Sequence, residues 1–160
     1  MKKLLPVTLA TIALGATALV SFAEDELPFQ NEIEARQSFM HILRFNLGIL
    51  GAMAKGEAPY DAAQASAAAN NLLAASKMSN SAMWPSGSDM GAEGLEGATA
   101  AKPDIWASMP SFGEKGHALT EALEGMAAAA GDGLGALRSN MGAVGDGCKG
   151  CHESFRAPED

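Results

Sequence analysis

Apolar residues recur at helical spacing along three stretches of the chain. In the first stretch the recurring positions are Ile33, Met40, Leu43, Leu47, Leu50 and Ala54. Steps of three and four residues place apolar side chains on one face of an α-helix. The same alternation runs from Ile105 to Ala130 and from Leu134 to Phe155. The pattern therefore predicts three amphipathic helices, over about residues 28–56, 104–130 and 132–155.

A fourth helix is predicted from composition, because alanine is by far the commonest residue in residues 60–78. Turn-forming residues separate the four segments at 56–59, at 131–133 and throughout 79–103, which we expect to be a long loop. Pro110 interrupts the third segment. Since proline lacks an amide N–H, it either kinks that helix or marks its real first turn.

Four helices with at least one short connection predict an all-α fold, an antiparallel four-helix bundle. Five methionines lie at or near the expected core positions, where methionine commonly fills gaps: Met40, Met53, Met109, Met126 and Met141. Aromatic residues make up only 6% of the chain, which argues against an all-β fold. The net charge of −8 argues against binding to nucleic acid, which requires a basic surface.

The first 23 residues are typical of a secretory signal peptide. Two lysines precede an apolar stretch over residues 4–20, and Ser21-Phe22-Ala23 forms a small-x-small cleavage site. The alternative is a membrane anchor, but a stretch of about 17 residues containing Pro6 is short for a span of ~20. We expect cleavage after Ala23, export to the periplasm, and a mature bundle of residues 24–160 with a net charge of −10 that does not span the membrane.

The residues that indicate chemistry are Cys148-Lys149-Gly150-Cys151-His152, the C-x-x-C-H signature of covalent haem attachment. On a helix, Cys148 and Cys151 share one face, so both sulfurs can reach the vinyl-derived carbons of one porphyrin edge. His152 lies on the same side and can ligate the iron. Because both cysteines continue the apolar stripe, we expect one haem c, held by two thioethers, to enter the bundle core.

Two cysteines at this spacing also occur in redox pairs, disulfides and zinc sites. A thioredoxin-type redox pair requires a βαβ context that this helical stretch lacks. A structural disulfide across so short a loop stabilises little. A zinc site needs a fourth ligand from His41 or His117, and nothing ties either to the motif. We expect both of these histidines to lie at the surface.

Four segments of the chain bear on its family. The haem motif lies near the C-terminus and is followed by Phe155-Arg156. The first helix contains Arg36-Gln37-Ser38-Phe39-Met40, and residues 53–63, at its end, read Met-Ala-Lys-Gly-Glu-Ala-Pro-Tyr-Asp-Ala-Ala. The third helix opens with residues 101–106, Ala-Lys-Pro-Asp-Ile-Trp. Together these segments resemble the cytochrome c prime family, the class II c-type cytochromes of bacterial periplasms, whereas ordinary class I cytochromes have the haem motif near the N-terminus.

The resemblance implies roles for residues outside the motif. Arg36 and Gln37 match positions beside the haem, with Arg36 near a propionate, a role suited to its two-pronged guanidinium. Thr99 lies in the loop that often supplies another propionate contact. Arg156 matches a basic residue beside the axial His152.

Met40 matches the position over the open face of the iron, and two functions follow from it. As an apolar lid, it would leave a five-coordinate iron that binds nitric oxide or carbon monoxide. As an axial ligand opposite His152, it would give a six-coordinate electron carrier. A peroxidase would need a distal acid–base group, and His41 points about 100° away around the helix, so we expect no enzyme. The expected partners are a periplasmic redox protein and a second copy of the chain, bound through the first two helices.

Overall fold

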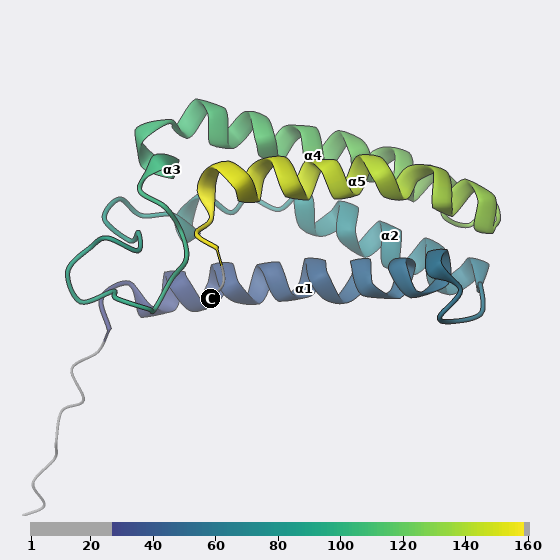
Figure 1. Ribbon diagram of the computed structural model, residues 1–160, viewed down its shortest axis with the longest axis horizontal. Coiled ribbons are helices and arrows are strands. Elements are labelled where there is room, and N and C mark those ends of the chain that lie inside the picture. The colour runs from purple at the N-terminus through teal and green to yellow at the C-terminus, as the bar shows by residue number, and fades with distance from the viewer. Residues whose placement is uncertain (1–26, 159–160) are drawn as a thin grey trace, which may run out of the picture.

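The computed structural model describes residues 27–158, and the predicted signal peptide lies outside this range. Four long helices run alternately in opposite directions (Figure 1). They are α1 (Gln30–Lys55), α2 (Ala62–Ser76), α4 (Met109–Ala129) and α5 (Leu134–Phe155). Each packs against two neighbours, in the order α1, α2, α4, α5 and back to α1. The predicted all-α antiparallel four-helix bundle is confirmed.

The helices begin and end where the turn-forming residues predict. α1 ends at Gly56, whose φ of 80° lies in the left-handed region that glycine adopts without strain. α2 begins after Asp61, whose carboxylate accepts a hydrogen bond from the Gln64 amide at 2.8 Å. Within residues 27–158 no helix has the length and apolar content that crossing a bilayer requires.

The predicted third helix is divided in two. A short helix, α3 (Asp104–Ala107), ends before Ser108, and α4 begins at Met109 with Pro110 in its first turn. The expectation of one continuous helix is therefore wrong, and the alternative role of Pro110 is confirmed, because a first-turn residue needs no helical amide partner. Met109 does not belong to the core either, since its side chain is 39% exposed at the start of α4.

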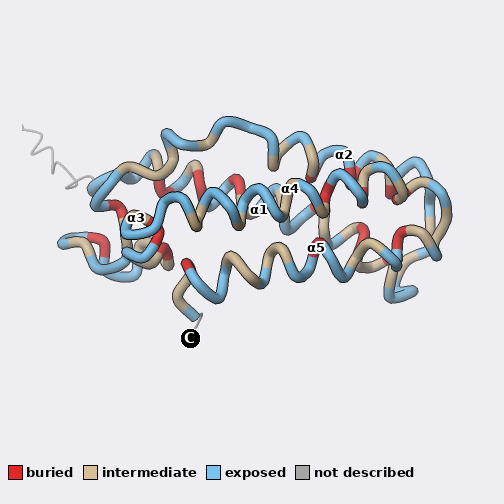
Figure 2. The backbone as a smooth tube through the Cα atoms, turned by 90° about the horizontal axis from the view of Figure 1, so that it is seen from above, coloured by how far each residue is buried: buried red, intermediate tan, exposed pale blue. Residues whose placement is uncertain are grey.

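One end of the bundle, here called the closed end, is formed by the α1–α2 and α4–α5 connections. Its interior continues the main core, a cluster of buried apolar residues from the four long helices that includes Leu50, Leu72, Leu123 and Leu137. Figure 2 shows buried residues recurring along these helices between exposed ones. The Tyr60 hydroxyl donates to the carbonyl oxygen of Ala130 and accepts from the Gly133 amide, both at 2.9 Å. One side chain thereby joins the two connections.

At the opposite end, here called the open end, the start of α1, the loop after α2 and the last turns of α5 come together (Figure 1). The loop contains one helical turn, η1 (Ser81–Met83). A second apolar cluster lies here, with Ala101, Ile105 and Phe155 buried and Trp84, Trp106, Phe112 and Cys151 half-buried around them. Phe112 stands edge-on to both Trp84 and Phe155, at 4.9 and 5.4 Å between ring centroids.

Candidate haem site

The cysteines of the motif lie on the inward side of the last turns of α5. Cys148 packs against the main core and Cys151 against the apolar cluster of the open end. Burial raises the pKa of both thiols, and Cys148 raises that of Cys151 further, while Lys115 opposes the shift. A reactive redox cysteine needs the opposite, a lowered thiol pKa. The surroundings suit two cysteines that border a buried group.

His152 is exposed and lines a shallow hollow together with Lys102, Glu153 and Arg156. The Lys102 ammonium donates to the carbonyl oxygen of Glu153 at 3.2 Å. The Arg156 amide donates to the carbonyl oxygen of His152 at 3.0 Å. Arg156 thus lies next to His152, where the family resemblance places a basic residue.

Arg36 lies buried on α1 and is held by the loop. Its Nη1 donates to the Ser88 hydroxyl at 2.8 Å, and its Nη2 donates to the Ser88 carbonyl oxygen and, at 2.8 Å, to the Thr99 hydroxyl. The neighbouring Gln37 donates from Nε2 to the carbonyl oxygen of Ala98 at 3.0 Å. The structure therefore brings together Arg36, Gln37 and Thr99, three of the residues singled out from the sequence.

The positive charge of Arg36 is poorly compensated. Burial lowers the pKa of its guanidinium, and the charge of Asp89 acts only in the opposite direction. None of the ion pairs within residues 27–158 includes Arg36. Buried charges in proteins are normally paired, so a nearby anion would stabilise this site.

Trp84 supplies a second unused donor at the same place. Its ring lies under the guanidinium, with 5.1 Å from Arg36 Cζ to the ring centroid. Its Nε1 is buried and has no hydrogen-bond partner. A guanidinium has five N–H groups, of which Arg36 uses three in the bonds above. Free donors on both side chains therefore fit an anionic acceptor such as a haem carboxylate.

Neither Trp84 nor Ser88 was identified from the sequence. A tryptophan inside a loop rich in glycine and serine is a signal that could have pointed to Trp84, because so large an apolar side chain is rarely left in water. Ser88 carries no such signal. Its burial depends entirely on how the loop folds over Arg36.

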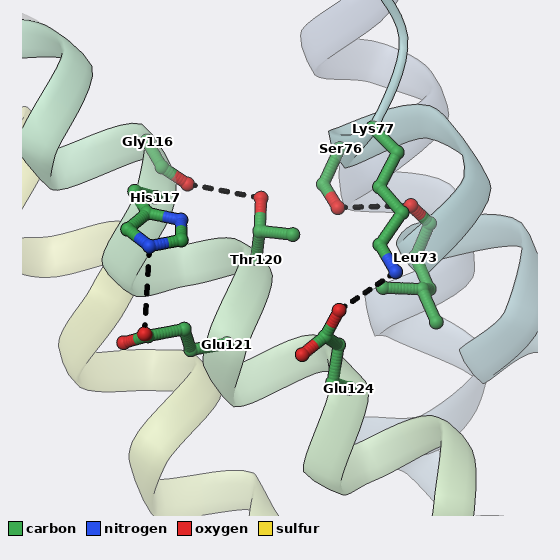
Figure 3. Close-up of polar contacts among 8 residues, drawn as sticks. All are labelled: Leu73, Ser76, Lys77, Gly116, His117, Thr120, Glu121 and Glu124. Carbon is green, nitrogen blue, oxygen red and sulfur yellow. Dashed lines mark hydrogen bonds and ion pairs between the residues drawn. The ribbon is translucent and has the colours of Figure 1, made fainter.

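Met40 is half-buried one helical turn after Arg36. The next residue, His41, is exposed and lines a hollow on the outer side of α1 with Arg44, Phe45 and Gly48. His117 is exposed on α4, where its Nε2 lies 3.5 Å from Glu121 (Figure 3). Both histidines lie at the surface, as predicted.

Comparison with known proteins agrees with these observations. The family described as "Cytochrome C'" matches residues 31–156. A cytochrome c' from Cereibacter sphaeroides is 40% identical over 152 residues, covering 94% of this chain and 96% of its own. Among solved structures, a cytochrome c' from Rhodobacter sphaeroides superposes with a TM-score of 0.77 at 38% identity, covering 82% of this chain and 98% of its own.

A further solved structure is the nitric oxide complex of a mutant of cytochrome c prime from Alcaligenes xylosoxidans. It has a TM-score of 0.69 and 32% identity, with 82% of this chain and 97% of its own covered. The cofactor of these relatives is covalently bound haem c, and Cys148 and Cys151 are consistent with its attachment here. The chain belongs to the cytochrome c' family, haem proteins that transfer electrons or bind gases.

Proposed function

We propose that this protein is a periplasmic haem c protein whose iron is held by His152 alone among its side chains, and which binds small uncharged gases and exchanges electrons with a redox protein. The observation that carries the proposal is the set of residues that meet at the open end. There a C-x-x-C-H motif with half-buried cysteines lies at the same end as a buried arginine that has no ion-pair partner within residues 27–158.

In this proposal the cysteines and the donors of the open end hold opposite parts of one cofactor. Cys148 and Cys151 form the two thioether bonds. Arg36 and Trp84 donate hydrogen bonds to a haem carboxylate, which would neutralise the buried charge. Thr99 can join them, because its hydroxyl proton is still available while its oxygen accepts from Arg36. Gln37 borders this group through its bond to Ala98.

Met40 would border the bound haem as an apolar lid, while His152 would hold its iron. The bound haem would supply one-electron oxidation and reduction and the binding of a neutral diatomic molecule. A thioether and its methylenes offer no hydrogen-bond donor to an anion, so the lid favours uncharged gases. The nitric oxide complex of a mutant of the Alcaligenes xylosoxidans relative supports this class of ligand.

The alternative is an iron with both His152 and Met40 as axial ligands, which would make the protein an electron carrier only. It is favoured by the half-buried position of Met40 one turn from Arg36, within the part of α1 that borders the site. A thioether ligand raises the reduction potential and gives a low-spin iron. The two possibilities therefore differ in their spectra.

The spectrum of the ferrous protein distinguishes them. We expect a high-spin spectrum and rapid binding of carbon monoxide, with the spin state unchanged in Met40→Ala. Met78→Ala is the matched control, because Met78 is 46% exposed just after α2. A low-spin ferrous spectrum, together with a sulfur-to-iron band of the ferric protein that disappears in Met40→Ala but not in Met78→Ala, would establish the six-coordinate alternative.

The protein is proposed not to be an enzyme. Peroxidase chemistry requires an acid–base group above the iron, and the histidine nearest to Met40 in sequence, His41, lies on the outer side of α1. We expect turnover of peroxide no faster than that of free haem. Turnover far above that level would require a catalytic role.

Export is part of the proposal, with residues 1–23 removed as a signal peptide. Haem attachment to a C-x-x-C-H motif takes place outside the bacterial cytoplasm, which agrees with a periplasmic location. N-terminal sequencing of the purified protein should begin at Glu24. An N-terminus that retains Met1 or Lys2 would contradict cleavage.

We further propose a homodimer formed through α1 and α2. On the outer side of α1 the side chains of Ile42 and Phe45 are 53% and 70% exposed. In a monomer, contact of these large apolar side chains with water costs free energy. Phe45→Glu should convert the dimer to a monomer in sedimentation velocity. Met109→Glu, a similar change at an exposed apolar residue of α4, should leave the dimer intact.

A further inference from the structure

Residues 98–102, here called the bridging segment, connect the two helices that face each other across the proposed haem site. On the α1 side, Gln37 donates to the carbonyl oxygen of Ala98 at 3.0 Å. Arg36 donates to the Thr99 hydroxyl at 2.8 Å. Both donors belong to the helix that carries Met40.

On the other side, the same segment is bonded to the end of α5. The Ala157 amide donates to the carbonyl oxygen of Ala100 at 2.8 Å, and the Lys102 amide donates to that of Phe155 at 3.0 Å. Ala101 forms an isolated antiparallel bridge with Arg156. These bonds reach the chain three to five residues after His152.

Thr99 joins the two sets of bonds. Its hydroxyl oxygen accepts from Arg36 and also from the amide of Ala101 at 3.2 Å. A hydroxyl oxygen has two acceptor positions, so both are used. A further hydrogen bond holds the segment to the preceding part of the loop: the Met90 amide donates to the carbonyl oxygen of Ala101 at 2.8 Å. Displacement of Arg36 therefore acts on the residues that hold the end of α5.

We propose that the bridging segment couples the Arg36 side of the haem site to the end of α5 that carries His152, with Thr99 as the positioning residue. The inference rests on the proposed function for the role of His152. Movement of the last turn of α5 changes the hydrogen bonds available to Arg36, and loss of those bonds loosens the end of α5. Coupling between two sites acts equally in both directions.

The test compares Thr99→Val, which removes the hydroxyl but keeps the shape, with Thr99→Ser, which keeps the hydroxyl. Thr120→Val is the matched control, since the Thr120 hydroxyl donates only within α4, to Gly116 at 3.1 Å (Figure 3). In the haem-loaded proteins we measure hydrogen exchange at the amides of Lys102 and Ala157. The iron–histidine stretching frequency of the ferrous form is measured alongside.

In Thr99→Val we expect both amides to exchange about tenfold faster, the change that corresponds to losing one hydrogen bond. The iron–histidine frequency should shift as well. Thr99→Ser should restore both readouts, and Thr120→Val should change neither. If the amides of Lys102 and Ala157 exchanged in Thr99→Val at the same rate as in the wild type, the inference would be overturned.

This result is separable from the proposed function. If the protein carried no covalent haem, its intact mass would show it and the proposed function would fail, whereas exchange at Lys102 and Ala157 would still test the bridging segment. If Met40 proved to be a second axial ligand, the iron–histidine band of a five-coordinate iron would be missing. The exchange at Lys102 and Ala157 would then still decide whether the bridging segment couples the two sides.

Discussion

The closed end and the open end of the bundle are built from different kinds of side chain. At the closed end, Leu50, Met126 and Leu137 are fully buried, and the Tyr60 hydroxyl is bonded on both sides. At the open end, three of the aromatic rings and both cysteines are half-buried, the Trp84 Nε1 has no partner, and buried Arg36 is in none of the ion pairs of residues 27–158. The chain completes one end by itself, whereas the other end fits a large planar group with anionic substituents.

The largest effect expected from a single substitution lies at the closed end. Leu137→Ala removes a side chain with no exposed surface and should lower the free energy of unfolding by about 3 kcal/mol. The loss should be the same in the haem protein and in a haem-free Cys148→Ala/Cys151→Ala variant, because distant sites contribute independently. Chemical denaturation of the four proteins measures this. If the loss in unfolding free energy differed between the haem protein and the haem-free variant, the two ends would not contribute independently to stability.

Tyr60→Phe tests the polar part of the closed end. It removes the donor to Ala130 and the acceptor for the Gly133 amide, and should cost about 1–2 kcal/mol. We expect the absorption spectrum of the haem to remain that of wild type. Thermal unfolding followed at the helical signal gives the loss, and a changed haem spectrum would contradict the separation of the ends.

Trp84→Phe tests the open end, because it keeps an aromatic ring under Arg36 and deletes the unpaired N–H together with part of the indole. In the haem-free variant only the loss of ring volume should destabilise the protein, since the N–H has no partner there. In the haem protein the cost should be about 1 kcal/mol larger, through loss of a hydrogen bond to a carboxylate. Denaturation of both forms gives the difference, and an equal cost in the two would remove Trp84 from the proposed haem contacts.

The smallest effect is expected far from both ends, at the exposed ion pair of Lys77 and Glu124 with an N–O distance of 2.7 Å (Figure 3). The hydrogen bond and charge of Lys77 lower the pKa of Glu124 below 4.5. A lowered pKa stabilises the folded state above 4.5, and this contribution disappears as the pH falls through the lowered value. Glu124→Gln should thus lower the melting temperature slightly at neutral pH and leave it unchanged in acid. Salt at ~1 M should remove the difference.

The sequence predicted the parts of the molecule that depend on local spacing. Helical periodicity, the alanine-rich composition of residues 60–78 and the turn residues at Gly56 and Gly133 were sufficient for the four long helices. The spacing of the two cysteines was sufficient to place both on the inward face of α5. Pro110 could not be assigned to one role, because both roles satisfy its missing amide. The structure alone decides that it begins α4.

The remainder of the site depends on contacts between distant residues. Arg36 meets Ser88 across 52 residues and Thr99 across 63. The loop has no periodic pattern that could predict such contacts. Among the loop residues, the resemblance to the family suggested only Thr99. Trp84 and Ser88 therefore appeared only when the path of the loop was known.

The central claim is that a covalently held haem completes the open end. The intact mass of the exported, purified protein tests it most directly, with Cys148→Ala/Cys151→Ala as the control. We predict the mass of residues 24–160 plus one haem for the wild type, and the mass of the polypeptide alone for the denatured control. A wild-type mass without haem, with both thiols free, would contradict this claim.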